Sequence, residues 1–132
     1  MSFDDAKRDI IANEKRYNGW TNYETWNVKL WIDNDEGSYR YYGELAQECY
    51  DEAEADTTFT REENATGALR ERLKDEYETA MADWLEESHK SASVWADLLG
   101  AALSEVNWHE IAEHLIDDTD KEEAETDDTD AQ

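Results

Sequence analysis

Apolar side chains recur every three to four residues along most of this chain, and that period is typical of amphipathic α-helices. Strand-type alternation is hard to find, so the pattern predicts an all-α protein: a compact bundle of about five to six helices. Residues 60–86 show the period most clearly, with Leu69, Leu73 and Trp84 on one face. The predicted helices cover residues 3–15, 22–34, 38–54, 60–86, 107–115 and a segment that begins at Ser91 or Ser93 and reaches Val106.

Polar residues suited to capping a helix precede several of these segments. Thr21 with Glu24, and Thr60 with Glu63, match the capping box, in which each side chain accepts from the other residue's backbone N–H. Ser38 is the expected cap of the helix that follows it. The chain has no proline, so no predicted helix is forced to break. The residues expected inside the bundle are Trp26, Leu30, Leu69, Leu73, Trp84, Leu98 and Leu99.

The net charge of −24, from 36 acidic and 12 basic residues, changes which functions are plausible. A basic patch for binding nucleic acid directly is excluded, because phosphate contacts need Lys and Arg. Binding to an anionic membrane surface is disfavoured for the same reason. Six Trp, seven Tyr and two Phe are too many for a disordered acidic chain, and they supply large buried areas from few residues.

The sequence predicts one domain, residues 1–116, followed by an acidic tail, residues 117–132. The tail holds nine acidic residues against a single lysine and has no large apolar side chain, so we expect it to be disordered. The single cysteine, Cys49, excludes an intramolecular disulfide and fits a reducing compartment. No apolar leader and no apolar run of about 18 residues is present. We therefore expect a cytoplasmic protein.

No motif predicts catalysis. His109 and His114 resemble the zinc motif H-E-x-x-H, but they are five residues apart and point about 140° apart on a helix. His109 with Glu113, or Glu110 with His114, could form one edge of a site, but a solvated helix face is the preferred interpretation. The acidic turn Asp33–Gly37 fails as a calcium loop, because Gly43 falls where the bidentate Glu belongs. We expect no enzyme activity, no metal and no cofactor.

Aromatic residues gather in residues 20–31, where Trp20, Tyr23, Trp26 and Trp31 occur. Such a cluster suits base stacking, but a chain this acidic would repel phosphates. Core packing is therefore the preferred interpretation.

Acidic residues also form two rows at helical spacing, opposite the apolar faces. Like charges four residues apart cost about 0.2–0.5 kcal/mol each at low salt, so the rows need an explanation. One is mimicry of a phosphate row, which would let the protein occupy the basic surface of a nucleic-acid-binding protein. The alternative is a salt-adapted helical protein of unrelated housekeeping role, whose charges are screened by its solvent. The rows are Glu44, Glu48 and Asp51, and Glu71, Asp75 and Glu78.

Two strings resemble a family of small, acidic phage- and prokaryote-encoded proteins of unassigned function. The first is GWTNYETWNVKLWIDND at residues 19–35, and the second is WADLLGAAL at residues 95–103, followed by VNWHEIAEHL at residues 106–115. The resemblance implies no catalytic residue. A phage setting favours mimicry, since small acidic phage proteins often inhibit host defence. We therefore expect a non-enzymatic protein that binds a basic host protein of defence or regulation.

Overall fold

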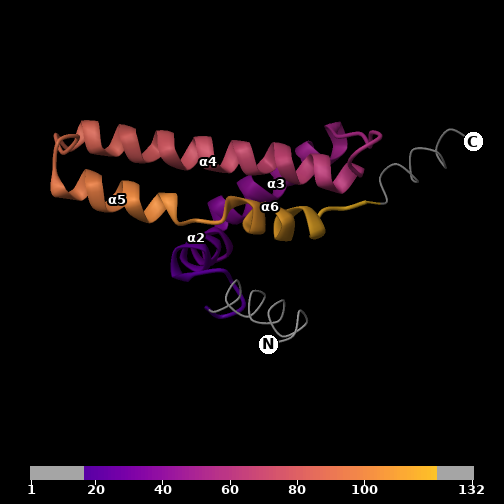
Figure 1. Ribbon diagram of the computed structural model, residues 1–132, viewed down its shortest axis with the longest axis horizontal. Helices are drawn as coiled ribbons and strands as arrows, with labels where there is room; N and C mark the ends of the chain where they lie inside the picture. Colours follow the sequence, from indigo (N-terminus) through magenta and orange to yellow (C-terminus); the bar gives the residue numbers. More distant parts are fainter. Residues whose placement is uncertain (1–16, 122–132) are drawn as a thin grey trace, which may run out of the picture.

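The computed structural model describes residues 17–121, and all regular elements within this range are helices (Figure 1). This confirms the all-α prediction. The predicted helix at residues 3–15 and the predicted tail beyond residue 121 lie outside the described residues. The helices are α2 (Tyr23–Asn34), α3 (Glu36–Glu52), α4 (Arg61–Glu87), α5 (Val94–Ser104) and α6 (Trp108–Asp117).

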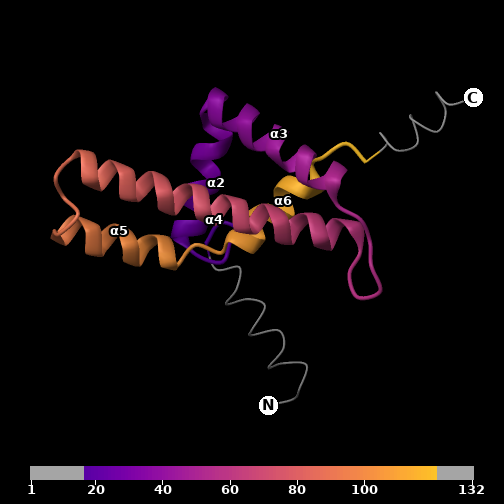
Figure 2. The same ribbon diagram turned by 90° about the horizontal axis from the view of Figure 1, so that it is seen from above.

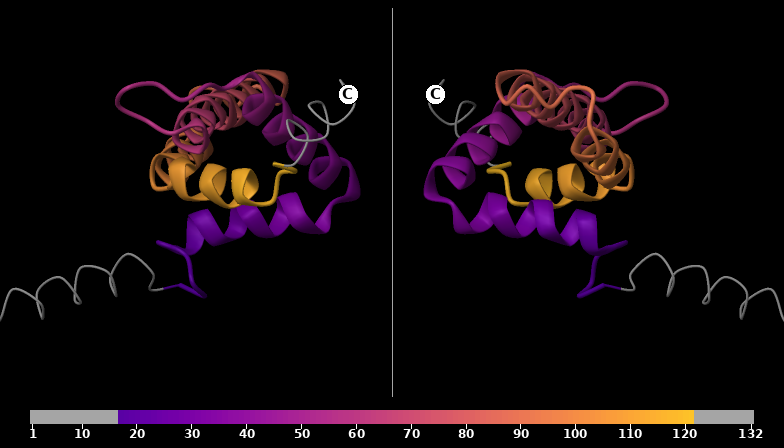
Figure 3. Two further views of the ribbon diagram at one scale, coloured as in Figure 1. Left: turned by 90° about the vertical axis from the view of Figure 1, so that its right-hand side faces the viewer. Right: turned by 90° about the vertical axis from the view of Figure 1, so that its left-hand side faces the viewer.

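The long helix α4 organises the molecule. Helices α3 and α6 pack against its N-terminal half, and α2 packs on α3 and α6, whereas α5 runs back antiparallel beside its C-terminal half (Figures 1 and 2). Viewed along the long axis, α6 lies between α2 and α4, and α3 closes the side (Figure 3). The molecule therefore consists of a four-helix body and a helical hairpin that reaches away from it. No helix in the described part is both long and apolar enough to cross a bilayer.

The core lies where α3, α4 and α6 meet. Leu69 and Leu73 of α4 and Ile111 of α6 are fully buried, and Ile32 of α2 packs against the same cluster. Each such side chain contributes about 1.5–3 kcal/mol on burial. The periodic apolar face of α4 thus holds the body together along the first half of that helix.

Two of the predicted helix caps are wrong, whereas those at Thr60, at Ser93 and at Asn107 are confirmed. Thr60 and Glu63 form the capping box in both directions, at 3.1 and 2.9 Å. The cap of α2 is Asn22, one residue after Thr21, because its carboxamide accepts from the Thr25 N–H at 2.9 Å. The cap of α3 is Asp35, which accepts from the Ser38 N–H at 2.9 Å and lets the helix begin three residues earlier than predicted.

A buried hydrogen-bond network joins the starts of α2 and α6. The fully buried Thr25 hydroxyl donates to Asn22 Oδ1 at 2.6 Å and accepts from the Asn107 N–H at 2.8 Å. The Thr21 N–H donates to the buried Glu110 carboxylate at 3.0 Å. Asn107 also caps α6 by accepting from the Glu110 N–H. The network joins the strings at residues 19–35 and 106–115 and accounts for the polar side chains that take part in it.

Three of the predicted core residues are not in the core. Trp84 is 54% exposed, Leu98 is 57% exposed and Leu99 is also exposed. They lie on the hairpin, beyond the reach of α2, α3 and α6 (Figure 2). Trp26 and Leu30 are only half-buried and do not belong to the core cluster either, so of the seven predicted core residues Leu69 and Leu73 are buried as expected.

The first residues of the predicted tail contact the body. Asp117 completes α6, and Asp120 exchanges two hydrogen bonds with the Gln47 carboxamide, at 2.8 and 3.0 Å. The ammonium of Lys121 lies 5.3 Å from the Tyr50 ring and donates to carbonyls at the end of α6. This docking fixes the chain direction as it leaves α6.

Candidate functional site

The acidic row of α3 lies on the outside of the body. Glu44, Glu48 and Asp51 are all exposed, and the buried Leu45 and Cys49 occupy the other side of the helix. Asp51 accepts from the Gln47 side chain at 3.0 Å, which leaves its charge unneutralised. The row therefore offers carboxylates to solvent without any need for them in the core.

The acidic row of α4 has the same relation to the core. Glu71, Asp75 and Glu78 are exposed on the side of α4 opposite Leu69 and Leu73. Within the described part of the chain, Glu71 is the one member of the two rows with an ion pair, to the neighbouring Arg70 at 2.8 Å. Both rows thus point outward as their spacing predicts.

The structure separates the two rows over different surfaces. Glu71 and Asp75 border a hollow between α3 and α4, together with Glu52. Glu44 borders another hollow, beside Lys29 of α2. The two rows therefore lie on two adjoining faces, one on α3 and one on α4. A partner that contacts both rows must extend across both helices.

The side chains in and beside the hollow between α3 and α4 stabilise the fold and are not set up for catalysis. Burial raises the pKa of the Cys49 thiol, so the thiol stays protonated and is a poor nucleophile. Arg72 pairs with Glu76 at 3.4 Å, and the Tyr41 hydroxyl donates to the same carboxylate at 2.8 Å. That hydrogen bond raises the pKa of Tyr41. The one arginine beside the hollow is thus already paired.

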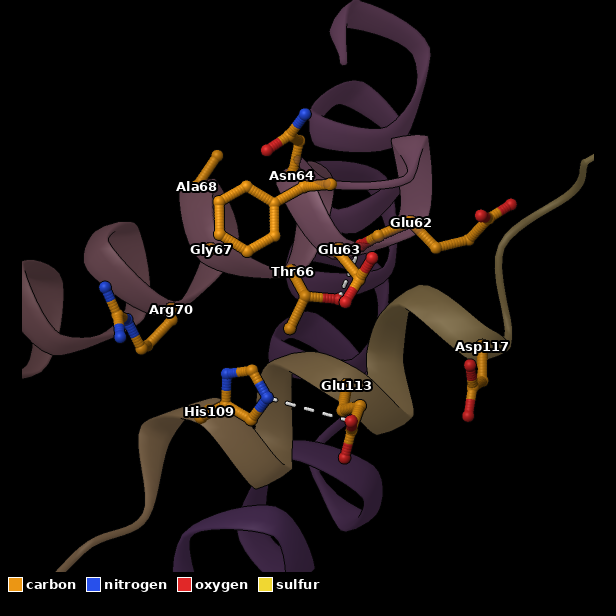
Figure 4. Close-up of a pocket in the computed structure, with 11 residues that line it drawn as sticks. Glu62, Glu63, Asn64, Thr66, Gly67, Ala68, Arg70, His109, Glu113 and Asp117 are labelled. Carbon is orange, nitrogen blue, oxygen red and sulfur yellow. Dashed lines mark hydrogen bonds and ion pairs between the residues drawn. The ribbon is translucent and has the colours of Figure 1, made fainter. Parts of the chain in front are cut away.

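A third hollow lies between the start of α4 and the outer side of α6 (Figure 4). His109 and Glu113 point into it from α6 and form a pair at 3.7 Å, while Arg70 approaches from α4. His114 lies elsewhere and stacks on Trp20 at 4.3 Å between ring centroids. The two histidines therefore occupy different faces, as their spacing indicates. Residues 17–121 contain no group of three or more His, Cys, Asp or Glu placed to hold a metal ion.

The aromatic cluster of residues 20–31 divides between core and surface. Trp20 packs on the core, and Trp26 lies against Tyr17 and Tyr23 with tilted rings, whose centroids are 5.2 and 5.5 Å from its own. Tyr23 itself is half exposed, and Trp31 is 64% exposed. Most of the cluster therefore braces the first turn of α2 against residues 17–20.

The feature that sequence analysis missed is an exposed apolar surface on the hairpin. Helix α5 has no buried residue, although Asp97 and Ser104 are its only polar members. A helix that is apolar on most sides normally lies in a protein interior, so this composition could have signalled a covered position. We call the exposed apolar side the hairpin face. Its residues are Ala80, Trp84, Val94, Trp95, Leu98, Leu99 and Ala102.

Comparison with known proteins places the chain in a family. Residues 13–128 match a family of unknown function, DUF7249. The chain belongs to that family. No curated protein and no solved structure matches it. The matched segment includes both acidic rows, the buried network of Thr25 and the hairpin.

Proposed function

We propose that this DUF7249 protein is a non-enzymatic binding protein that acts as a DNA mimic. Its acidic rows on α3 and α4 take the place of a phosphate backbone and occupy the basic surface of a nucleic-acid-binding protein. The observation that carries the proposal is the position of the rows. All six carboxylates are exposed opposite the core, and Glu71 is the only one of these six with an ion pair to another described residue.

The like charges within each row lower the stability of its helix, which favours a functional reason for keeping them. Carboxylates four residues apart on a helix stand about 5–6 Å apart and destabilise it by about 0.2–0.5 kcal/mol per pair. Replacing exposed members of the rows would cost the fold little. A surface that keeps unneutralised like charges at regular spacing is better explained by a cationic partner than by stability.

We propose in addition that the protein is of phage origin and acts inside a host cell. The resemblance of residues 19–35 to phage and prokaryotic proteins favours a phage protein that inhibits a host defence or regulatory protein. Such a protein would work in the host cytoplasm and would bind no nucleic acid itself, since its surface repels phosphate.

Charge reversal of one row tests the proposal. The triple variant Glu71→Lys, Asp75→Lys and Glu78→Lys should lose at least tenfold in affinity for basic proteins retained from host lysate. The matched control reverses three exposed, scattered carboxylates, Glu54, Glu86 and Glu105, and so changes the net charge equally.

The readout is retention on the immobilised protein, followed by elution with duplex DNA and with rising salt. We expect duplex DNA to displace the partner from the wild type, and binding to weaken steeply with salt. If both triple variants lose affinity equally, or if DNA displaces nothing, the rows are not a phosphate mimic.

A further inference from the structure

The apolar face of α4 continues past the point where the body covers it. Leu69 and Leu73 are fully buried, and Tyr77 is half-buried against the core. One and two turns further along the same stripe, Ala80 and Trp84 are exposed, because α2, α3 and α6 end before them (Figure 2). The hairpin face is thus an extension of the core that lacks its cover.

The exposed residues of α4 and α5 turn to the same side of the hairpin. Near the end of α4, Met81 and Leu85 are more buried than their neighbours, which indicates that they face α5 and that Trp84 is turned to one side. On α5, Ala96 and Leu103 are more buried than most of their neighbours, which indicates that they face α4 and that Trp95 is turned to one side.

Successive residues are about 100° apart around a helix axis, so Trp84 and Trp95 each lie roughly 60–100° from the residues that face the other helix. Because the two helices are right-handed and antiparallel, both tryptophans are turned to the same face of the hairpin. Glu78 and Ser104 line a hollow on the opposite side of the hairpin, as this geometry requires.

We infer that the hairpin face is covered by the hairpin of a second copy of this chain, so that α4 and α5 of both copies form a four-helix bundle. Five large apolar side chains on this face are between 37% and 61% exposed. With ~150–250 Å² per aromatic side chain, they amount to roughly 500 Å² per copy. Two copies bury about 1,000 Å², which reaches the area that a specific interface needs.

The composition of the face favours a second copy over a cationic partner. The hairpin face contains no charged residue, so nothing on it attracts a basic helix. The small Ala80 lies one turn from Trp84 and the small Ala102 two turns from Trp95, so that large side chains of one copy can pack on small ones of the other. Asp83 and Glu87 border the face and repel their counterparts, and Asp97 lies on the other side of α5.

The salt dependence of this association has a sign opposite to that of the proposed basic partner. Added salt screens the repulsion between the acidic borders and strengthens apolar pairing. Dimerisation should therefore tighten as salt rises, whereas mimicry of DNA should weaken. The inference does not depend on the proposed function, because the acidic rows and the hairpin face lie on different sides of α4.

Sedimentation equilibrium of the full chain at ~0.1 and ~1 M salt tests the inference. The wild type should be a dimer whose dissociation constant falls at the higher salt. Trp95→Glu should weaken the dimer by at least about thirtyfold, as expected for a central interface tryptophan. Trp31→Glu is the matched control, since Trp31 is 64% exposed but lies on α2, and this variant should dimerise like the wild type.

Circular dichroism shows whether each variant is folded, and Leu98→Glu provides a second disruption if Trp95→Glu does not fold. A wild type that stays monomeric at about 100 μM in both salts overturns the inference. A dimer that dissociates with salt, or that is abolished by Trp31→Glu and retained by Trp95→Glu, overturns it as well.

Discussion

At the scale of single residues, the polar side chains that matter most for the fold are the buried ones. Thr25 is fully buried and links Asn22 to Asn107 through its hydroxyl. Replacing it with Val keeps the shape and removes both hydrogen bonds, which leaves the Asn107 N–H without its partner. We expect a loss of about 1–3 kcal/mol in the free energy of unfolding.

Urea denaturation of Thr25→Val measures this loss, and Thr79→Val is the control because Thr79 is exposed on α4. The control should change stability by no more than about 0.5 kcal/mol. Equal effects of the two substitutions would show that the network contributes nothing specific.

The same network explains why the start of α2 could not be predicted in detail. Thr21, Asn22 and Thr25 are all able to cap a helix, and their order in the sequence does not say which one does. The choice is made by residues more than 80 positions away: Glu110 binds the Thr21 N–H, and the Glu105 carbonyl accepts from the Asn22 side chain at 2.6 Å. Thr60 and Glu63 form a local pair without such competition, so that capping box could be predicted.

At the scale of helices, periodicity predicted which face of α4 is apolar but not how far that face is covered. The spacing from Leu69 to Trp84 is regular throughout. How much of the apolar face of α4 is buried depends on where α3 and α6 end against it, and this is set by tertiary packing. The acidic rows follow the same logic: their outward direction could be predicted from the apolar faces, whereas their separation over two surfaces depends on how α3 crosses α4.

Two alanine substitutions on this one stripe should therefore have different effects. Leu73→Ala removes a fully buried side chain and should cost about 2–5 kcal/mol in the free energy of unfolding. Trp84→Ala, in dilute protein where the hairpin is uncovered, should cost about 1 kcal/mol or less. Thermal melts at micromolar concentration compare the two, and a larger loss for Trp84→Ala would mean that the body itself buries the hairpin.

At the scale of the whole molecule, the governing quantity is the net charge of −24. Repulsion among these charges opposes folding and is weakened by salt. The buried core, the hydrogen-bond network and the capped helices act against it and do not depend on salt to the same degree. The balance between these terms decides whether the acidity is kept for a partner or reflects adaptation to a saline solvent.

A melting series across salt concentration decides between mimicry and salt adaptation. We expect the protein to unfold cooperatively from a folded state at ~0.15 M salt, with a melting temperature that rises modestly towards 1 M as the Debye length falls from about 8 to about 3 Å. A salt-adapted protein would instead be loosened near 0.1 M and would need molar salt to fold.

The series is best run on Trp95→Glu, so that association of copies does not contribute to the salt effect. In that background, Glu71→Lys, Asp75→Lys and Glu78→Lys together should flatten the salt dependence, because they remove neighbouring like charges from α4. Unfolding of the parent variant at ~0.15 M would contradict mimicry in an ordinary cytoplasm and would assign the acidity to the solvent.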